Sequence, residues 1–204
     1  MKSICIVNYG LGNIASLYNS LSKIGYAPEF CSDNLEKNYD IIFIPGIGSF
    51  SKGSKLIHKK KIYQFINRHV NNNCFVFGIC LGMQLLLSSG TENGKSKGLN
   101  IFNGNVKKLS LRENLILPVI GWQAVKFKKD FNNLKKKYNN EKFYFIHSYA
   151  AHINQVKNVL TETTYDRIKY ISALQKENIL GTQFHPEKSG EVGLSFLKDV
   201  IKCA

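Results

Sequence analysis

The chain lacks any long apolar run. Its best candidate for a membrane-spanning segment, at residues 74–86, is interrupted by Gly78, Gly82 and Gln84. It therefore falls short of the roughly 20 apolar residues that a membrane helix needs. The N-terminal stretch, in which Lys2 precedes a short strand-like run, also lacks the long apolar region of a signal peptide. We expect a cytoplasmic protein that does not enter a membrane.

The chain also lacks paired cysteines. Its five cysteines are odd in number and show no paired spacing, which argues against a disulfide framework and for a reducing compartment. No C-x-x-C or similar cluster of metal ligands is present in the sequence. A dinucleotide loop is missing too, because Ala15 replaces the third glycine of G-x-G-x-x-G after Gly10 and Gly12. We predict no metal and no cofactor.

Acidic residues are few: 14 Asp and Glu stand against 28 Lys and Arg, a net charge of +14. Lysines cluster at residues 59–61, 126–129 and 135–138, and such clusters can neutralise nucleic-acid phosphates. However, we recognise no nucleic-acid-binding motif, and Lys and Asn are abundant throughout. We interpret the lysines as solvated faces, or as a surface for an acidic partner subunit, and expect no nucleic acid as partner. Lack of affinity in a gel-shift assay would exclude that alternative.

What is present centres on Cys80. Residues 74–79 are apolar without alternation, as in a strand buried on both faces of a parallel sheet. Leucines then recur at helical spacing from Leu81. A cysteine on the turn between such elements, with Gly78 and Gly82 allowing close approach, is typical of a nucleophile elbow. The positive end of the following helix favours a thiolate. The alternative interpretation is a small core residue beside a tight turn.

A second pattern supplies what a nucleophile needs. Residues 179–184 read as a strand, and Pro186 ends it so that His185 and Glu187 lie just beyond. His185 can accept the thiol proton and later protonate a leaving amine, while Glu187 can orient the imidazole. Taken alone, this pattern is more typical of a surface turn with an incidental His and Glu. Together, the two patterns favour a catalytic triad of Cys80, His185 and Glu187.

The stretches GICLGMQ at residues 78–84 and QFHPEKS at residues 183–189 resemble the two signatures of class I, triad-type glutamine amidotransferases. Within that class the chain is most similar to the glutaminase subunits of imidazole glycerol phosphate synthase, the histidine-pathway enzyme. The resemblance extends over essentially the whole chain, so we expect residues 1–204 to form a single glutaminase domain. The stretches that carry the closer similarity are residues 9–13, 45–50, 121–122 and 145–149.

The resemblance and the periodicity both imply an α/β fold with an open, mixed, mostly parallel central sheet. Helices flank it and an additional antiparallel β region follows, in a flavodoxin-like arrangement. The predicted strands are residues 3–8, 27–31, 41–44, 74–79, 99–111, 119–127, 142–148, 159–165, 168–174 and 179–184. The predicted helices are the segment from the end of the Gly10–Gly12 turn to about residue 24, residues 61–72, the segment after Cys80, and residues 192–201. We also predict a loop at 87–98 and an exposed loop or short helix at 131–140.

Backbone N–H groups are the expected oxyanion donors. The turn that begins at Pro45 can expose the N–H groups of Gly46 and Gly48 to the oxyanion formed when Cys80 attacks a carboxamide. Such a turn is otherwise a plain strand-to-helix loop. The resemblance implies that the N–H of Leu81 is the second donor. It also implies that the amino-acid end of L-glutamine is held by Gln84, Glu92, Ser148 and Tyr149.

Several polar residues have a structural interpretation beside the functional one. Glu92 lies in a T-E-N-G turn that suits any exposed acid, and a strand that ends in His-Ser-Tyr at 147–149 is usually structural. His147 is a second candidate for the base, but we prefer His185 because Glu187 lies close to it in the sequence. We expect His69, beside the apolar stripe of its helix, to be structural.

The resemblance implies a heterodimer in which a cyclase or synthase subunit of (β/α)8 type receives the ammonia, with Asn13 and Trp122 at the contact. One stretch departs from the family: residues 118–123 read PVIGWQ, where the family commonly carries PHMGWN. A paralogous subunit that supplies ammonia for the modification of surface-polysaccharide sugars is therefore the alternative. The identity of the synthase whose gene lies next to the gene for this chain distinguishes the histidine pathway from this alternative. A γ-glutamyl peptidase of the same broad fold would use Cys80 and His185 without a partner.

The elbow pattern predicts that Cys80→Ala keeps the fold and abolishes glutaminase activity, because no other group can form the acyl intermediate. Glu187→Gln should leave a small residual activity, since its amide still contacts the imidazole but no longer stabilises the imidazolium. Glutamate release from glutamine, measured with the synthase partner present, tests both variants. Full activity in Cys80→Ala would contradict the mechanism.

Overall fold

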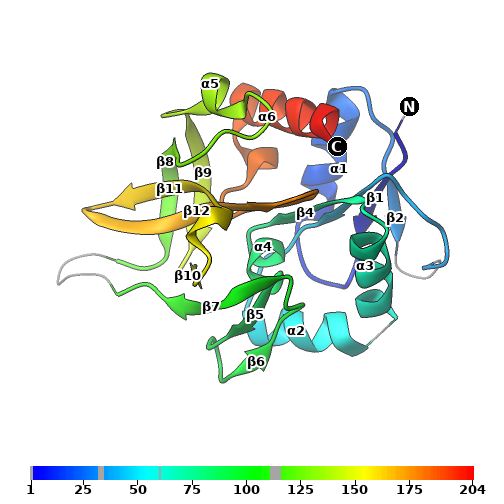
Figure 1. Ribbon diagram of the computed structural model, residues 1–204, viewed down its shortest axis with the longest axis horizontal. Coiled ribbons are helices and arrows are strands. Elements are labelled where there is room, and N and C mark those ends of the chain that lie inside the picture. The colour runs from blue at the N-terminus through cyan, green and yellow to red at the C-terminus, as the bar shows by residue number, and fades with distance from the viewer. Residues whose placement is uncertain (1, 32–34, 60, 111–115) are drawn as a thin grey trace.

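The computed structural model describes residues 2–31, 35–59, 61–110 and 116–204. Five parallel strands form one half of its sheet (Figure 1). Their sequences are apolar runs without alternation, and nearly all their side chains are buried, because helices cover both faces. In spatial order the strands are β2 (Glu29–Cys31), β1 (Ile4–Val7), β3 (Ile41–Ile44), β4 (Phe75–Ile79) and β13 (Ile179–Thr182).

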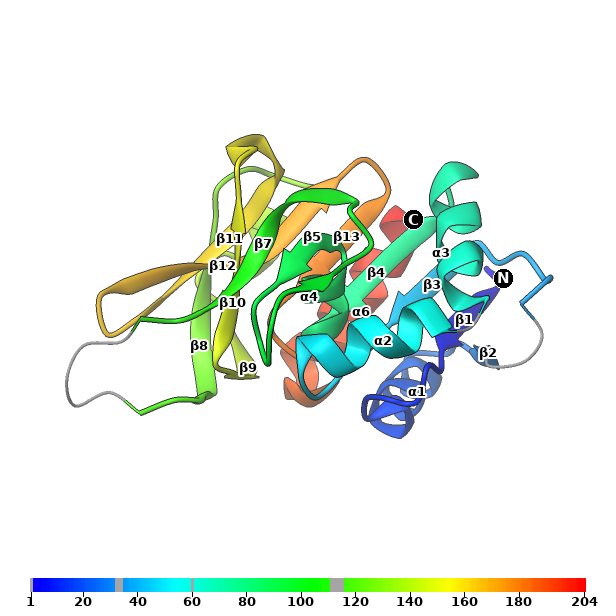
Figure 2. The ribbon, with the colours of Figure 1, turned by 90° about the horizontal axis from the view of Figure 1, so that it is seen from below.

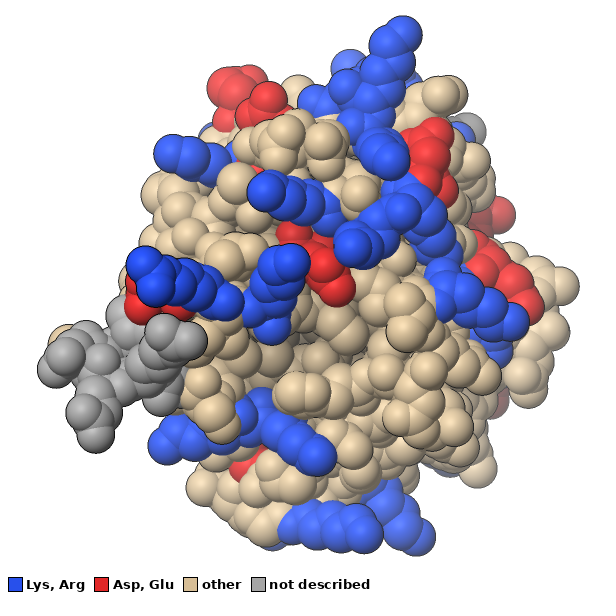
Figure 3. Space-filling model, turned by 60° about the vertical axis from the view of Figure 1, so that its left-hand side comes forward, with Lys and Arg blue, Asp and Glu red and all other residues tan. Residues whose placement is uncertain are grey.

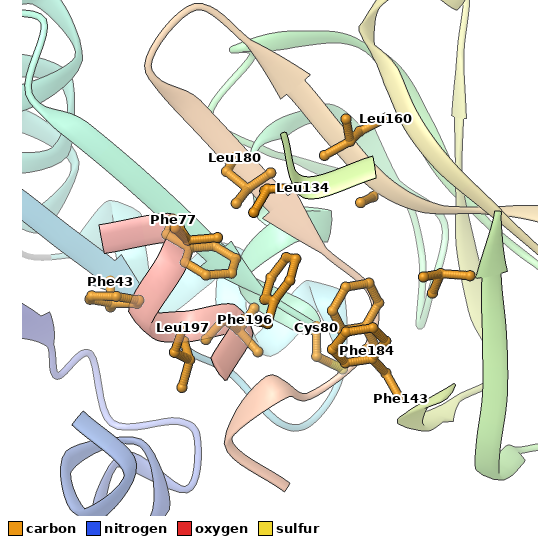
Figure 4. Packing of buried hydrophobic residues seen from close by; sticks show 14 of the residues in the cluster. Phe43, Phe77, Cys80, Leu134, Phe143, Leu160, Leu180, Phe184, Phe196 and Leu197 are labelled. Carbon is orange, nitrogen blue, oxygen red and sulfur yellow. The ribbon is translucent and has the colours of Figure 1, made fainter. Parts of the chain in front are cut away.

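Helices lie on both faces of these strands, as Figures 1 and 2 show. Alternate strand residues enter two separate cores: Ile6 packs with the helices of one face, and its neighbour Val7 with those of the other. Figure 4 shows the first core, in which the rings of Phe77 and Phe196 meet edge to face and to which Cys80 also belongs. The first face carries α1 (Ile14–Lys23) and α6 (Gly190–Cys203), and the second carries α2 (Phe50–Lys59), α3 (Ile62–Asn71) and α4 (Leu81–Leu85).

The sheet continues past β13 in antiparallel pairing and then branches. The branch begins at β12 (Ile168–Lys176), which pairs with β10 through Ala151 and Ile171 and with β11 along most of its length. One arm contains β10 (Tyr149–Ile153), β7 (Phe102–Lys108), β5 (Leu87–Gly90) and β6 (Ser96–Lys97). The other contains β11 (Val159–Tyr165), β8 (Val119–Phe127) and β9 (Lys142–His147), with α5 (Leu134–Tyr138) in the β8–β9 connection and the 3-10 turn η1 (Val156–Asn158) before β11.

The predicted fold class is confirmed: a mostly parallel central sheet carries helices on both faces and an antiparallel extension. Most predicted strands and helices lie within a few residues of the observed ones. The helix α2 was not predicted, because its lysines and serines obscure the apolar stripe formed by Phe50 and Ile57. The end of the run predicted at 99–111 reaches residue 111, which lies outside the described residues.

Of two predictions about loops, the one for residues 87–98 was wrong and the one for residues 131–140 was right about a short helix but wrong about its exposure. Residues 87–98 are not simply a loop, because β5 and β6 form there and β5 pairs with β7. Serines and a glycine hid this strand, whose ends are nevertheless buried. Residues 131–140 do form a short helix, but it is not fully exposed: Leu134 and Tyr138 are buried, and the Tyr138 ring meets Phe196 of α6 at 5.2 Å between centroids.

The prediction that His69 is structural agrees with its contacts. The buried imidazole accepts a hydrogen bond from the backbone N–H of Tyr39 at Nε2 (3.1 Å), and its Nδ1 donates to the carbonyl oxygen of Phe65 (2.8 Å). Burial lowers the pKa of His69, since the charged form would lose hydration. A neutral imidazole therefore ties α3 to the residues that precede β3.

The lysine clusters lie at the surface and are partly paired. Lys137 forms an ion pair with Asp199 (2.7 Å), and Lys128 forms one with Glu162 (3.3 Å). Figure 3 shows a face on which lysines and arginines are interspersed with acidic side chains. Of the cluster at 59–61, residue 60 and the side chain of residue 59 lie outside the described residues. In the described part of the chain, no helix has the length and apolar character needed to cross a membrane.

Packing at the elbow generates a stability prediction. A Cβ at Gly82 would overlap the backbone carbonyl of Ile44, so Gly82→Ala should destabilise the protein by about 3 kcal/mol or more, because backbone must move. Gly53→Ala in α2 is the matched control. Its Cβ would meet only the ends of the Leu85 and Leu81 side chains, at 3.1 and 3.2 Å. Urea unfolding of the two variants measures the difference, and equal stabilities would contradict the close approach.

Candidate active site

The backbone holds Cys80 in a strained turn between β4 and α4. Its φ of 55° and ψ of −109° are unusual for a residue with a side chain. Glycine at 78 and 82 allows this turn, because a Cβ at either position would collide with backbone. The N–H of Cys80 donates to the carbonyl oxygen of Thr182 in β13 (2.7 Å). The side chain is only 7% exposed, so the sulfur lies in a nearly closed site.

His185 and Glu187 follow β13 and lie beside this turn. The Nδ1 atom of His185 is 2.7 Å from Oε1 of Glu187, and the two side chains are only 1% and 5% exposed. The backbone of His185 is fixed as well, since its N–H donates to the carbonyl of Tyr144 and its carbonyl accepts from the Ser189 hydroxyl. Pro186 begins the 3-10 turn η2 (Pro186–Lys188) that brings Glu187 back towards the imidazole.

The environment of His185 favours the imidazolium. Burial by itself lowers the pKa of His185, but the sulfur of Cys80 and the carboxylate of Glu187 outweigh it and raise the pKa to about 10. Because Nδ1 faces Glu187, Nε2 is the free nitrogen, and it has no hydrogen-bond partner among the described residues. The charged ring can therefore hold a thiolate and present a proton from Nε2.

A cavity of about 80 Å³ opens at Cys80 and gathers most of the predicted site residues. This volume suits a small group such as a carboxamide and excludes a large ligand. Gly46 is not among its lining residues, and a Cβ at this position would collide with the Tyr9 hydroxyl and the Leu81 side chain. The lining residues that the sequence had predicted are Gly48, Cys80, Leu81, Gln84, Glu92, Ser148 and Tyr149.

Three predicted substrate residues, Gln84, Glu92 and Tyr149, already have protein partners. Oε2 of Glu92 accepts a hydrogen bond from the N–H of Phe50 (2.8 Å), at the start of α2. The carbonyl of Tyr149 accepts from the Gln84 side-chain amide (3.0 Å) and lies 3.0 Å from Nδ1 of His147. These contacts hold the cavity wall in position.

His147 lines the cavity, but among the described residues its imidazole contacts no carboxylate that would orient it as a general base. Burial is the main cause that lowers its pKa to about 4, and the charge of His185 adds to this, while the hydrogen bond to the Tyr149 carbonyl acts in the opposite direction. It has no carboxylate partner among the described contacts, in contrast to His185. The geometry therefore favours His185 over His147 as the base.

The sequence analysis named no role for Gln183, although this residue contacts the nucleophile. Its Nε2 lies 3.6 Å from the sulfur of Cys80, and its Oε1 accepts from the Gln84 amide (3.0 Å). The side chain is completely buried. Gln183 lies within the QFHPEKS stretch, but only the three-dimensional pairing of β13 with β4 brings it to the sulfur.

The two predicted interface residues lie at the surface. Asn13 is exposed and its side chain caps α1 by accepting from the N–H of Ser16 (3.2 Å). Trp122 is 49% exposed and meets Tyr144 edge to face, with 6.3 Å between ring centroids. Trp122 belongs to β8, which pairs with the strand that carries Ile146 of the cavity lining.

Comparison with known proteins places this arrangement in a family. The sequence matches the family described as "Glutamine amidotransferase class-I" over residues 5–203. The match covers nearly the whole chain, so the chain belongs to the class-I glutamine amidotransferases. This confirms the resemblance drawn from the two motifs.

Curated relatives narrow the family further. Proteins from Caldanaerobacter subterraneus subsp. tengcongensis and Thermotoga maritima are each 38% identical to the chain, over 98% of it and 99% and 97% of their own lengths. Both are named "Imidazole glycerol phosphate synthase subunit HisH". At this identity and coverage, the chain belongs to the HisH family within the class.

Solved structures support the fold alone. A chain of "Structure of PurLQS from Thermotoga maritima" aligns with a TM-score of 0.76 at 20% identity, covering 99% of both chains. A chain of "Crystal structure of glutamine amidotransferase" aligns with a TM-score of 0.70 at 14% identity, covering 96% of both. The parallel sheet with its antiparallel extension is therefore shared with these two chains.

The raised pKa of His185 predicts how stability changes with pH. A folded-state pKa near 10, above the ordinary 6.5, contributes stability that is complete below pH 6.5 and lost as the pH rises towards 10. Glu187→Gln removes one cause of the raised pKa, so its unfolding free energy should fall less between about pH 6 and about pH 9 than that of the unmodified protein.

Urea unfolding at several pH values measures this difference. Glu162→Gln is the matched control, since Glu162 pairs with Lys128 at the surface, away from the imidazole. Its pH dependence should follow that of the unmodified protein. An identical slope in Glu187→Gln would show that the carboxylate does not hold the charge on His185.

Proposed function

We propose that residues 1–204 form a single glutaminase domain that hydrolyses L-glutamine to glutamate and ammonia. The ammonia passes to a cyclase subunit of (β/α)8 type in a heterodimeric imidazole glycerol phosphate synthase, in the cytoplasmic histidine pathway. The observation that carries the proposal is the buried His185 and Glu187 pair beside Cys80 on its strained turn. The HisH relatives support the pathway.

The first half of the reaction forms a thioester. The thiolate of Cys80 attacks the carboxamide carbon of glutamine, and a new C–S bond forms. As the C–N bond breaks, the imidazolium of His185 gives its Nε2 proton to the departing nitrogen, so ammonia leaves and the γ-glutamyl thioester remains. Glu187 stabilises the charged ring beforehand through its 2.7 Å contact with Nδ1.

The second half of the reaction restores the enzyme. The now neutral His185 accepts a proton from water, which adds to the thioester carbon. The C–S bond breaks, glutamate leaves, and the thiolate and imidazolium of the starting state are re-formed. The low exposure of both side chains keeps this exchange away from bulk solvent.

The oxyanion of each step is held by backbone N–H groups in this proposal. Gly48 and Leu81 line the cavity together with Cys80, which supports their amides as the two donors. The N–H of Gly46, in the same turn as Gly48, remains a further proposed donor, and a Cβ at Gly46 would collide with the Tyr9 hydroxyl. Gln84, Glu92, Ser148 and Tyr149 then hold the amino-acid end of glutamine from the same wall.

An exposed apolar strip supports β8 as the partner contact. Ile120 is 55% exposed and Trp122 is 49% exposed, and residues two apart on a strand face the same way. Their partners across the β8–β9 ribbon are Ile146 and Tyr144. Because Ile146 also lines the Cys80 cavity, a subunit seated here would lie next to the place where ammonia is released. Asn13 is the second proposed contact.

Residues 118–123 differ from the sequence that the family commonly carries. Because of this difference, the experiment below also tests the sugar-modifying alternative. Val119 is fully buried opposite His147, so its difference from the family changes the core rather than an outer surface. Ile120 is exposed and can change partner contacts directly. The relatives named as HisH subunits favour the histidine pathway over the sugar-modifying alternative.

Purification of the tagged protein from its own cell extract, followed by assay of the complex, tests the proposal. Co-purification of a cyclase that stimulates glutamate release and consumes the histidine-pathway ribonucleotide is the expected result. Co-purification of a sugar-modifying synthase would overturn the pathway assignment and leave the glutaminase. Hydrolysis of γ-glutamyl peptides by the isolated chain, in preference to glutamine, would indicate a peptidase.

The apolar strip predicts that Trp122→Ala weakens binding to the cyclase by roughly tenfold or more, because large aromatic anchors often dominate interface energies. Val156→Ala is the control, since Val156 is exposed but lies in η1, outside the strip. Calorimetric titration of each variant with purified cyclase measures the affinities. Unchanged affinity in Trp122→Ala would place the contact elsewhere.

A further inference from the structure

We propose that Gln183 is a further catalytic residue, whose side-chain amide donates a hydrogen bond to the sulfur of Cys80 and stabilises the thiolate. Its Nε2 lies 3.6 Å from the sulfur, a normal separation for a hydrogen bond to sulfur. The side chain has no exposed surface, so water does not compete for this donor. The inference rests on the proposed role of Cys80 as nucleophile.

The direction of this hydrogen bond follows from its neighbours. The carbonyl of Tyr149 can only accept, so the Gln84 group that meets it at 3.0 Å must be the amide nitrogen. The same nitrogen lies 3.0 Å from Gln183, which must therefore present its oxygen, Oε1, to Gln84. The NH2 group of Gln183 is left to face Cys80. The chain of contacts thus fixes which end of the Gln183 amide faces the sulfur.

The thiol and the thiolate of Cys80 have different partners. A protonated sulfur can donate to the carbonyl of Ile146, 3.9 Å away. A thiolate has no proton to donate and can only accept. The donor at hydrogen-bond distance from it is the amide of Gln183, and the positive charge of the His185 imidazolium adds a favourable electrostatic interaction. Because a hydrogen bond to a charged acceptor is stronger than one to a neutral acceptor, Gln183 favours the ionised form.

A purely structural role for Gln183 is the competing explanation. In that case it would act only by holding Gln84, which contacts the Tyr149 carbonyl in the substrate wall. The two roles differ in one observable property. Support of Gln84 affects glutamine binding, whereas donation to the sulfur changes the pH at which Cys80 reacts.

The test is the rate of Cys80 alkylation by iodoacetamide as a function of pH, followed on the Cys80 peptide by mass spectrometry so that the other cysteines do not interfere. Gln183→Met keeps the volume and removes the donor. We expect its pH midpoint to rise by about one unit, with roughly tenfold slower alkylation near neutral pH. An unchanged profile in a folded Gln183→Met protein would overturn the proposal.

Two further variants separate the roles. Gln84→Met should raise the KM for glutamine in the partner complex and shift the alkylation profile less than Gln183→Met does, because Gln183 loses its orienting partner but keeps its donor. An equal shift in Gln84→Met would assign the effect to support of Gln84 and overturn direct donation. Gln175→Met is the matched control, because Gln175 donates to the carbonyl of Glu177 and lies on β12 outside the site. It should change neither property.

A second substitution guards against misfolding. If circular dichroism shows that Gln183→Met does not fold, Gln183→Asn keeps the amide chemistry but is one methylene too short to reach the sulfur, and it should shift the profile in the same direction. Alkylation needs neither glutamine nor a partner. A shifted profile in a protein that does not hydrolyse glutamine would therefore uphold the donor and reject the proposed substrate.

Discussion

The parallel pairing of β4 with β13 is the constraint on which the site depends. Its register matches Ile79 with Thr182, and the N–H of Cys80 then donates to the Thr182 carbonyl at 2.7 Å. Two strands far apart in the sequence therefore end side by side. Everything that follows β13, from the Gln183 amide to the His185 imidazole, arrives at the sulfur because of this one alignment.

Burial makes the charges at this junction effective. The imidazole of His185 is almost inaccessible to solvent, so its interactions with Glu187 and Cys80 act in a medium of low polarity. The same burial would strongly disfavour an imidazolium without a partner. His185 can carry a charge here because the carboxylate of Glu187 lies beside it. Close packing of glycine around the elbow supplies this burial, since side chains at 78 or 82 would push the layers apart. Fold and chemistry are thus linked through packing.

Sequence reasoning succeeded where local patterns carry the information. Apolar runs predicted the buried strands. The proposed triad was predicted from the glycines around Cys80 and from the turn at Pro186. It failed where a contact with another element decides the outcome. The strands β5 and β6 form because β7 offers β5 a partner, and α5 is half buried because the helix α6 lies against it. Gln183 was missed for the same reason. Its spacing along the chain says nothing of its approach to Cys80.

The central claim is that Cys80 forms a covalent γ-glutamyl intermediate during glutamine hydrolysis. The most direct measurement is acid quenching of the partner complex during turnover, followed by mass spectrometry of the Cys80 peptide. The account predicts a γ-glutamyl adduct on that peptide, lost once glutamine is exhausted. Hydrolysis without any adduct under conditions where the thioester should accumulate, or an adduct on another residue, would contradict it.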